Sequence, residues 1–581
     1  MEQNNLYKKR HSLSHLLAGA VLSFYPDAKL AIGPAVDNGF YYDFEFSTPI
    51  GDKDLGKIEQ KMRELLKKWP TFEKKEISIK EAEEMFAGNP YKLELITDIA
   101  KEGGTPTIYI SGDFTDLCAG PHVDKTKEIE SSSFKLERIA GAYWRGDEKN
   151  KMLTRIYSLA FETKADLEAY LKQQEEAEKR DHRKLGKELD LFCFSDLVGP
   201  GLPLYTPKGT IIIDELQKHI EAVCRKYGFE KVKTPHMAKR ILFETSGHAA
   251  KFADELFAVT SPKGHQFNLK PVQCPAQTQI YASKIRTYKE LPIRYMESDR
   301  QYRAEKTGEV GGLSRVYAIT CEDGHSFCRV DQVKQEVVNM VNIIKDFYTS
   351  LGLWKDNWVS LSVRDYAHPE KYIGDTKDWD LCEKMLQEIS DEMGLNAKKC
   401  EGEAALYGPK LDFMFKDAMG KEIQIPTVQL DFATPKRFNL TYVDNTGKEV
   451  NPVMVHRAVL GSYERFLVLL IEHFAGNFPL WLSPVQVKII PVRENHNEFA
   501  RKIAEELKSL NVRVELDDSD EGMGKKIRAG KVNKIPYMLV LGDKEMESGE
   551  LALEVRDGAT QEKITLENLK IKLQKEISER I

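Results

Sequence analysis

Hydrophobic and polar positions recur with different periods along this chain, so its parts are expected to fold differently. The first part combines an amphipathic helix around His11 and His15 with short strands that are rich in aromatic residues. These strands are predicted at residues 40–46, 107–114 and 152–161. A mixture of this kind is typical of an α+β domain, which we assign to residues 1–160.

The rest of the chain changes its pattern twice. Residues 161–185 are rich in Glu, Lys, Arg and Ala but have few apolar positions, which predicts an exposed connecting helix. Residues 186–482 carry mostly antiparallel strand patterns and helices, separated by glycine-rich loops. From residue 483 to residue 581, strand and helix patterns alternate at the spacing of βαβ units, which predicts a small α/β domain. The expected fold class is therefore multidomain α+β and α/β.

Length and composition exclude several classes of protein. A chain of 581 residues is too long for one hydrophobic core. It has 41% hydrophobic and 30% charged residues and no apolar run near the roughly 20 residues of a membrane span, so we expect no membrane segment. No secretory signal is recognisable at the N-terminus, and the eight cysteines are spread too widely for a disulfide scaffold. These features predict a cytoplasmic protein with reduced thiols.

Net charge gives no overall attraction to nucleic acid, because 85 basic and 91 acidic residues leave a charge of -6. Any RNA contact must therefore rely on local basic patches. Two candidates are Lys179, Arg180, Arg183 and Lys184 near the connecting helix, and Arg528, Lys531 and Lys534 near the C-terminus. Either patch could equally be a solvated charged face.

A predicted hairpin in the middle of the chain is the segment richest in candidate chemistry. Period-two alternation places Arg303 and Glu305 on one face of its first strand. The same alternation places Arg315, Asp323 and His325 on one face of its second strand. The glycine-rich loop between the strands has an arginine near each end, and such a pair can hold a polyphosphate through bidentate hydrogen bonds. A surface ladder of ion pairs is the alternative.

Arg465 lies in the first turns of a later apolar helix that follows Gly461 and Ser462. A cation is poorly matched to the positive end of a helix dipole. The arginine therefore needs a compensating partner, and a purine ring or a phosphate would serve.

These segments together resemble a known family. The Arg303-x-Glu305 hairpin, the GSYERF sequence around Arg465 and the helix-then-strand pattern before Pro235 resemble motifs two, three and one of the class II aminoacyl-tRNA synthetases. Other segments resemble the threonyl-tRNA synthetases in particular: those around Cys274, His325 and His456, and residues 244–248, 406–413 and 427–432. The resemblance runs from about residue 8 to the end. It implies an antiparallel-sheet catalytic core at 186–482, an editing domain at 1–160 and an anticodon-binding domain at 483–581.

The resemblance implies a threonine–tRNA ligase that activates L-threonine with ATP and Mg²⁺ and transfers it to the 3′-terminal adenosine of tRNA(Thr). In this family the positions of Arg303, Glu305 and Arg315 contact the α-phosphate, the adenine amino group and the outer phosphates. Arg465 would stack on the adenine, and His248 would lie near the reaction centre. The remaining substrate-contacting positions are Asp323, Tyr407, Lys410, Gln424 and Gln429.

The resemblance also implies one zinc ion per chain in the catalytic core. Its ligands would be Cys274, His325 and His456. An ion with three protein ligands can bind both the amino group and the β-hydroxyl of threonine, whereas an apolar pocket separates threonine from valine by only about 100-fold. Asp323 would accept a hydrogen bond from the hydroxyl. The alternatives are a zinc ion that only stabilises the fold, and a closed four-ligand site that includes Cys321 or Cys328.

Two positions depart from the family pattern. Ile319 stands where the family usually has phenylalanine, and Cys321 where it has glutamine. Loss of the aromatic ring removes one side of an adenine-binding sandwich, so ATP is expected to bind more weakly. The alternative function is therefore a tRNA-binding regulatory paralogue with weakened activation, and a further one is a free-acting deacylase.

Serine offers the same two donors as threonine and lacks only a methyl group, worth about 1 to 3 kcal/mol, so an editing step is expected. The residues that the resemblance places around the aminoacylated end of the tRNA are His11, His15, Cys118 and His122, with Tyr42, Lys92 and Asp116 nearby. Spacing alone would also allow zinc at these histidines and the cysteine. We favour hydrolysis of seryl-tRNA(Thr) without a metal.

The last domain resembles the anticodon-binding domain of several class II synthetases. Glu521, Lys526 and Arg528 match positions associated with anticodon contact, whereas Ser519 stands where an arginine is common. A plain charged surface is the alternative. The resemblance further implies a homodimer through motif one, and the small N-terminal domain that the family often carries has no counterpart before His11.

Overall fold

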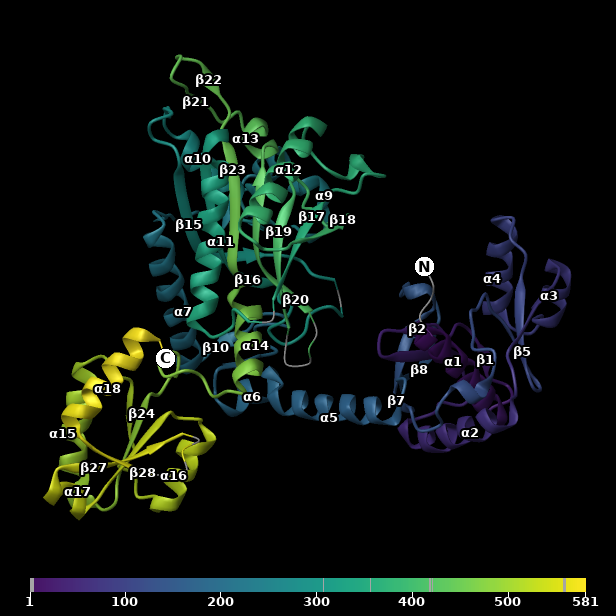
Figure 1. Cartoon of the computed structure of the whole chain (residues 1–581), viewed down its shortest axis with the longest axis horizontal. Helices are drawn as coiled ribbons and strands as arrows, with labels where there is room; N and C mark the ends of the chain where they lie inside the picture. Colours follow the sequence, from purple (N-terminus) through teal and green to yellow (C-terminus); the bar gives the residue numbers. More distant parts are fainter. Residues whose placement is uncertain are drawn as a thin grey trace. The chain divides into compact units, whose positions relative to one another are not determined.

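The computed structural model describes residues 5–306, 308–355, 357–416, 420, 422–556, 558 and 561–580. The chain divides into two compact units, residues 1–175 and residues 176–581 (Figure 1). Each unit has a hydrophobic core of its own. Within the described residues, no helix is both long enough and apolar enough to span a membrane.

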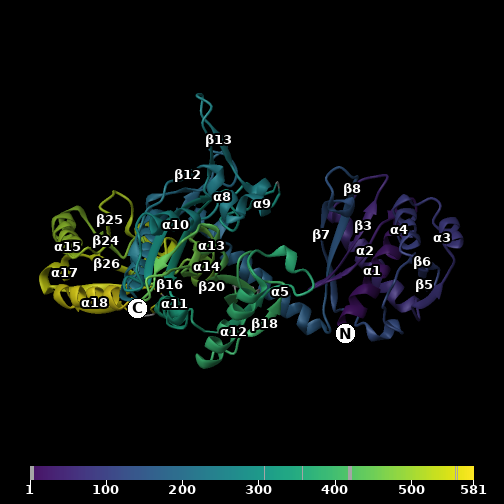
Figure 2. The same cartoon turned by 90° about the horizontal axis from the view of Figure 1, so that it is seen from above.

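The first unit packs two helices, α1 (Asn5–Phe24) and α2 (Leu55–Lys68), on a five-stranded sheet (Figure 2). The sheet has the order β1-β3-β8-β7, and β2 pairs with β3. Its strands are β1 (Lys29–Leu30), β2 (Ala35–Val36), β3 (Gly39–Glu45), β7 (Phe134–Tyr143) and β8 (Met152–Ala160). Alternate aromatic residues of β3, namely Phe40, Tyr42 and Phe44, are buried in the core that this sheet shares with α1. The expected α+β pattern is therefore present.

A smaller three-stranded sheet with the order β4-β5-β6 completes this unit. Its elements are β4 (Glu73–Glu76), α3 (Ile79–Met85), α4 (Pro90–Lys101), β5 (Thr107–Ser111) and β6 (Phe114–Leu117). Helix α4 begins with two strong start signals, because Pro90 is its first residue and the Asn89 side chain accepts from the Tyr91 and Lys92 N–H groups. This start places Lys92 in the buried first turn.

The expected single connecting helix is instead two helices, α5 (Lys164–Arg180) and α6 (His182–Glu188). Asp181 separates them because its carboxylate accepts from the Arg183 N–H at 2.7 Å and so begins a new helix. Of the proposed basic patch at this point, Arg183 pairs with Asp181, and Arg180 donates to the carbonyl of His473. Local pairing therefore uses part of that patch.

The second unit is built on an eight-stranded sheet with the order β11-β15-β16-β23-β20-β19-β17-β18. Among the described residues of this sheet, the parallel pairs are β11/β15 and β17/β18. The strands are β11 (Glu230–Lys231), β15 (Ile293–Tyr302), β16 (Ala318–Cys328), β17 (Trp358–Val363), β18 (Lys398–Glu401), β19 (Lys410–Lys416), β20 (Glu422–Asp431) and β23 (Val453–Ser462). The expected antiparallel character of this segment is confirmed.

The two faces of this sheet differ sharply in polarity. One face packs against four helices, α7 (Pro207–Lys226), α11 (Val333–Ser350), α12 (Thr376–Glu392) and α14 (Tyr463–Phe474). Figure 1 shows α7 and α11 running along the sheet. Alternate residues such as Val455, Leu430 and Leu411 point into this core, and a buried ion pair between Glu322 and Arg457 also lies on this side. The opposite face therefore receives the intervening residues, most of which are polar.

Short elements border the polar face. They are α8 (Arg240–Ser246), α9 (His248–Lys251), α10 (Cys274–Ala282), α13 (Ala433–Arg437) and the small strands β12 (Met237–Ala238), β13 (Ala258–Thr260) and β14 (Gln266–Leu269). Two further pairs are β9 (Phe192–Cys193) with β10 (Leu204–Tyr205), and β21 (Tyr442–Val443) with β22 (Glu449–Val450). Residues from α9 and α10 reach the candidate site described below.

The last domain has a five-stranded sheet with the order β25-β24-β26-β27-β28. Its elements are β24 (Val487–Pro491), α15 (Asn497–Ser509), β25 (Val514–Leu516), α16 (Met523–Val532), β26 (Tyr537–Leu541), α17 (Asp543–Ser548), β27 (Glu550–Val555), β28 (Gln561–Thr565) and α18 (Leu566–Glu579). Strands β24, β25 and β26 are parallel, as the βαβ pattern predicts. The antiparallel strands β27 and β28 extend this sheet.

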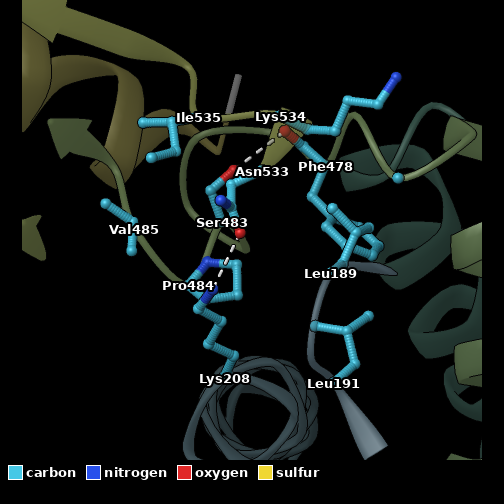
Figure 3. A pocket seen from close by; sticks show the side chains of 11 residues that line it. Leu189, Leu191, Lys208, Phe478, Ser483, Pro484, Val485, Asn533, Lys534 and Ile535 are labelled. Carbon is cyan, nitrogen blue, oxygen red and sulfur yellow. Dashed lines mark hydrogen bonds between the residues drawn. The ribbon is translucent and has the colours of Figure 1, made fainter. Parts of the chain in front are cut away.

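A small pocket lies where the last domain meets helix α7 (Figure 3). Lys208 of α7 donates to Asn533 Oδ1 at 3.0 Å across it, and Leu189 and Phe478 supply apolar walls. Arg556 of the last domain donates to the carbonyls of Asn477 and Phe478 at 3.3 and 2.9 Å nearby. Side chains and backbone of the two domains are therefore joined directly.

Candidate active site and editing site

Three potential metal ligands meet on the polar face of the eight-stranded sheet. Cys274 is the first residue of α10, and His325 and His456 are direct cross-strand neighbours on β16 and β23. All three residues are buried, and their ligand atoms lie within 4.8 Å of one another. Residues that are far apart in the sequence are thus brought together as the sequence analysis expected.

Each imidazole in this cluster uses one nitrogen in a hydrogen bond and keeps the other. His325 Nδ1 lies 2.8 Å from Gln277 Oε1, and His456 Nε2 lies 2.9 Å from Asp431 Oδ2. Burial lowers the pKa of His325 well below its ordinary value, which favours the neutral ring that binds metals. Burial, then the carboxylates of Asp323 and Asp431, raises the pKa of the Cys274 thiol, an effect that a bound cation reverses. One thiol and two imidazoles form a ligand set that suits zinc.

The fourth-ligand alternative receives no geometric support among the described residues. The cluster of possible ligands there contains Cys274, His325 and His456 only. Cys328 points into the helix-packed core on the other face of β16, because alternate residues of a strand face opposite sides. Cys321 lies where the register between β16 and β23 shifts, before Asp323.

The hairpin differs from the sequence prediction near its tip. Strand β15 ends at Tyr302 and β16 begins at Ala318, so Arg303, Glu305 and Arg315 lie in the connecting loop rather than on strand faces. The prediction was wrong for these three residues because the polar alternation continues past the ends of the two strands. Thr307 of this loop lies outside the described residues. Asp323 and His325 do share one face of β16, as predicted.

Three arginines converge at this end of the site. Partial desolvation, then the positive charges of Arg315 and Arg303, lowers the pKa of Arg465 on α14. Arg303 and Arg465 have no ion-pair partner among the described residues, and Arg303 Nε donates to the Pro271 carbonyl at 3.3 Å. Mutual repulsion of this kind favours binding of an anion.

Arg315 is paired in this structure, unlike its neighbours. Its Nη1 lies 2.5 Å from Glu309 Oε2, and its Nε lies 3.8 Å from Glu305 Oε2. The surface ion-pair alternative therefore applies to Arg315 and Glu305 but does not extend to Arg303. An incoming phosphate would have to compete with Glu309 for Arg315.

Three further candidate residues, Tyr407, His248 and Asp323, lie near the three potential metal ligands. The Tyr407 ring centroid is 5.0 Å from that of His456 and 5.9 Å from that of His248. Burial, followed by the charges of His456 and Arg303, lowers the pKa of His248 to about 4, so its ring is neutral at pH 7. Asp323 Oδ2 accepts from Gln301 at 2.8 Å, and burial raises the pKa of this carboxyl to about 6. Asp323 therefore keeps its other oxygen for a substrate donor.

Lys410 and Gln424 share an anchor that the sequence analysis missed. Asp412, which is buried, lies with Oδ2 2.8 Å from Lys410 Nζ and accepts from Gln424 Nε2 through Oδ1 at 2.6 Å. Gln429 pairs across the strands with Lys410 on one side and with His456 on the other. The signal for Asp412 was its place two residues after Lys410, on the same strand face.

The first unit holds a second cluster of histidines and cysteine. His11 and His15 come from α1, and Cys118 and His122 come from the segment after β6. Cys118 Sγ lies 3.3 Å from the Nε2 atoms of both His11 and His122, and the rings of those two histidines stack with centroids 4.2 Å apart. Their possible ligand atoms lie within 4.8 Å of one another. All four residues predicted for this site are thus together.

The charged residues predicted for the editing site lie beside His15. Lys92 Nζ is 2.5 Å from Asp116 Oδ1, and the Tyr42 hydroxyl donates to Asp116 Oδ2 at 2.5 Å. Asp116 Oδ2 is also 4.0 Å from His15 Nε2, and all four side chains are buried.

Burial sets the protonation state of this cluster. Desolvation lowers the pKa values of His11, His15 and His122, so their rings are neutral at pH 7. Burial also raises the pKa of the Cys118 thiol to about 12. The site therefore offers neutral hydrogen-bonding rings beside one paired ammonium group.

The predicted anticodon residues do not share one environment. Glu521 and Arg528 are exposed, whereas Lys526 is buried and donates to the Asp517 carbonyl at 3.0 Å. Lys526 therefore supports the backbone instead of presenting its ammonium to solvent. Lys531 pairs with Glu554 at 2.7 Å, which neutralises part of the basic patch proposed there.

Comparison with known families agrees with this geometry. The tRNA synthetase class II core domain (G, H, P, S and T) matches residues 257–474, and the anticodon binding domain matches residues 486–576. The threonyl and alanyl tRNA synthetase second additional domain matches residues 107–157. These three matches fall on the eight-stranded sheet, on the last domain, and on the part of the first unit that contributes Cys118 and His122.

Whole-chain relatives give the same result. The chain is 46% identical over 572 residues to a threonine–tRNA ligase of Gloeobacter violaceus, covering 97% of this chain and 91% of that protein. It is 47% identical over 544 residues to a threonine–tRNA ligase of Staphylococcus carnosus, covering 93% and 84%. A crystal structure titled as the RNA binding domain of threonyl-tRNA synthetase from Cryptosporidium parvum superposes with a TM-score of 0.64 at 33% identity, covering 68% of this chain and 98% of that one. The chain belongs to the threonyl-tRNA synthetases, class II enzymes that ligate threonine to tRNA.

Proposed function

We propose that the two clusters divide the work of a threonine–tRNA ligase between them. The polar face of the core sheet activates threonine with ATP and transfers it to the 3′-terminal adenosine of tRNA(Thr). The His11 cluster hydrolyses seryl-tRNA(Thr). The observation that supports this division best is the meeting of Cys274, His325 and His456 on a sheet face where Arg303 and Arg465 have no ion-pair partner among the described residues.

Threonine would be selected at the metal cluster. Cys274, His325 and His456 would hold one zinc ion, which supplies Lewis-acid coordination to an amino group and a hydroxyl when it is bound. Asp323 lies two residues before His325 on the same strand face and accepts the hydrogen bond of the threonine hydroxyl. Its pKa of about 6 keeps this carboxyl ionised at pH 7. Valine lacks the hydroxyl and would leave the second carboxylate oxygen of Asp323 without a donor.

ATP would be held by the arginine group with Mg²⁺. Arg303 contacts the α-phosphate, Arg315 exchanges Glu309 for the outer phosphates, and Arg465 stacks on the adenine near Glu305. The threonine carboxylate then attacks the α-phosphorus, and pyrophosphate leaves. Positioning and charge neutralisation account for most of the acceleration, because no proton transfer is required in this step.

Other residues on the same face would hold the reacting groups. Asp412 orients Lys410 and Gln424, and Gln429 lies between Lys410 and His456. His248 stays neutral at pH 7 and can accept or donate one hydrogen bond near the reacting carboxylate.

The test for activation is threonine-dependent ATP–pyrophosphate exchange combined with metal analysis of the purified chain. We expect about one zinc ion per chain, exchange with threonine and weaker exchange with serine, and no exchange with valine. A fully active chain without metal would overturn the zinc assignment. Absence of threonine-dependent exchange would favour the alternative, a regulatory paralogue, for which Ile319 and Cys321 on β16 are the motivating residues.

Editing would proceed without a metal. The neutral rings of His11, His15 and His122 can position a water molecule, while Asp116 and Tyr42 hold Lys92 toward the ester. Threonine would be excluded because of its additional methyl group. We expect the His11→Ala and His15→Ala variants to lose deacylation of seryl-tRNA(Thr) while they keep threonine activation. A second zinc ion per chain, lost together with deacylation in these variants, would contradict the metal-free proposal.

Two partner assignments complete the proposal. Glu521 and Arg528 on the exposed side of the last domain contact the anticodon loop, with Lys526 supporting the backbone. Two chains associate through the surface that includes α7 and β11. Light scattering at micromolar concentration tests the homodimer, and Arg528→Ala should weaken tRNA binding without changing pyrophosphate exchange.

A further inference from the structure

A line of buried polar contacts begins at His325 and runs along the same face of the sheet to Glu297, the cross-strand neighbour of Asp323. Gln277 lies one turn after Cys274 on α10 and is fully buried. Its Oε1 is 2.8 Å from His325 Nδ1, and its Nε2 donates to Glu297 Oε2 at 3.1 Å. The amide thus connects a metal-ligand candidate to a buried carboxylate.

Glu297 is surrounded by donors. Its Oε1 accepts from the Thr234 N–H at 2.6 Å and from the Thr234 hydroxyl at 3.0 Å, and the buried Lys270 Nζ lies 3.7 Å away. The backbone N–H and the ammonium can only donate. Glu297 therefore acts as an acceptor toward its neighbours, including Gln277.

This arrangement decides which way the Gln277 amide points. A primary amide has a donor end and an acceptor end, and only the donor end can face a carboxylate that acts as an acceptor. The Oε1 atom must then face His325, and it can only accept. His325 Nδ1 must therefore carry the proton, which leaves the lone pair on Nε2.

The tautomer of His456 is set by a single direct hydrogen bond. Its Nε2 donates directly to Asp431 Oδ2 at 2.9 Å, so its lone pair remains on Nδ1. Asp431 is itself held by the N–H groups of Ala433 and Thr434, each at 2.8 Å from Oδ1. Both rings are thus fixed by a carboxylate, one directly and the other through an amide.

We propose that Gln277, oriented by Glu297, is a positioning residue that sets the tautomer and ring orientation of His325 for metal binding. The inference rests on the proposed zinc site but concerns residues outside the set of ligands. Partners of this kind typically change metal affinity by 10–100-fold when they are replaced. The contacts of Glu297 also connect the ring to Thr234 and Lys270, so the position of the ligand depends on the segment before β12.

The first test measures zinc affinity of the full chain by competition with a chromophoric chelator. Gln277→Leu keeps the approximate volume but removes the acceptor, and we expect zinc affinity to fall about 10–100-fold. Gln279→Leu makes the same substitution two residues later on an exposed position of α10 and should stay within about 2-fold of the unaltered chain. The visible spectrum of the Co²⁺-loaded chain should lose tetrahedral intensity only in Gln277→Leu.

A second variant separates positioning from packing. Gln277→Glu places a carboxylate against His325 Nδ1, as Asp431 does for His456, but it also puts two carboxylates side by side. If the amide mainly packs the core, Gln277→Glu should bind zinc less tightly than Gln277→Leu. If it sets the tautomer, the order is reversed and Gln277→Glu retains most of the affinity. Glu297→Gln should give an intermediate loss, because a neutral amide no longer dictates the orientation of Gln277.

Zinc binding by the unaltered chain separates failure of the proposed zinc site from failure of the positioning role of Gln277. An unaltered chain that binds no zinc would refute the metal site itself. An unaltered chain that binds zinc, with Gln277→Leu binding it equally well, would refute only the positioning role. The thermal transition of Gln277→Leu shows whether this variant folds. If it does not fold, the zinc affinities of Gln277→Glu and Glu297→Gln still test the positioning role. If Glu297→Gln binds zinc as tightly as the unaltered chain, the proposal is overturned.

Discussion

The buried ion pair behind the metal cluster provides a quantitative test of the core. Arg457 is fully buried, and Glu322 accepts from its Nη1 and Nη2 atoms at 3.0 and 2.7 Å. Glu322 also accepts from the Val459 N–H at 3.2 Å. Replacement of Glu322 by leucine would leave a buried guanidinium and a backbone N–H without an acceptor. Loss of one partner of such a pair typically costs about 3–5 kcal/mol.

The assay is scanning calorimetry of the core transition. At about 2 °C per kcal/mol for a large domain, Glu322→Leu should lower the midpoint by about 6–10 °C. The double variant Glu322→Leu/Arg457→Met should recover most of this loss, because an apolar pair of similar volume needs no hydrogen bonds. Methionine can also pack on the Phe229 ring, whose centroid lies 5.0 Å from Arg457 Cζ. A midpoint unchanged in Glu322→Leu, or a double variant less stable than the single one, would refute this account.

Four further expectations concern activity and pH. Asp412→Asn should lower the rate of pyrophosphate exchange about 100-fold through misplacement of Lys410, with an unchanged melting midpoint as the control. Burial lowers the pKa of His219 to about 3, so the free energy of unfolding should fall by up to about 1.4 kcal/mol per pH unit as the pH drops below 6.5. His219→Gln should reduce this pH dependence in calorimetry, and an unchanged dependence would contradict the assignment. Removal of zinc by a chelator should abolish exchange but leave deacylation of seryl-tRNA(Thr) intact, and parallel loss of both would argue against two independent sites. Lys92→Met, which removes the ammonium paired with Asp116, should allow seryl-tRNA(Thr) to accumulate, and unchanged clearance of seryl-tRNA(Thr) would contradict the role proposed for Lys92.

Sequence periodicity predicted elements whose faces differ in polarity. The βαβ pattern of the last domain was correct because its strands are buried and its helices amphipathic. Periodicity failed at Arg303 and Arg315, because a loop can carry the same polar alternation as the strands that it connects. It also missed the helix break at Asp181. There the carboxylate accepts a hydrogen bond from the Arg183 N–H and begins a new helix, although the composition favours one continuous helix.

Family resemblance predicted which potential metal ligands would meet, but not the residues that hold them in place. Cys274, His325 and His456 were accessible through family resemblance, and the structure brings them together. Gln277 and Asp412 were not, because their roles depend on which strands are neighbours and in which register. Lys526 shows the converse case, since a lysine in a basic segment turned out to be buried against a backbone carbonyl.

Direct pairing of His325 with His456 has a consequence for how the core assembles. A slip of one residue between β16 and β23 would turn one histidine toward the helices and bring Val455 or Arg457 to its place. An ion that needs both rings can therefore bind only the correctly aligned strands, and its binding energy would favour that alignment over every neighbouring one. Zinc binding would in this way select the correct pairing of β16 with β23. The chain should therefore refold with fewer misaligned products when zinc is supplied from the start.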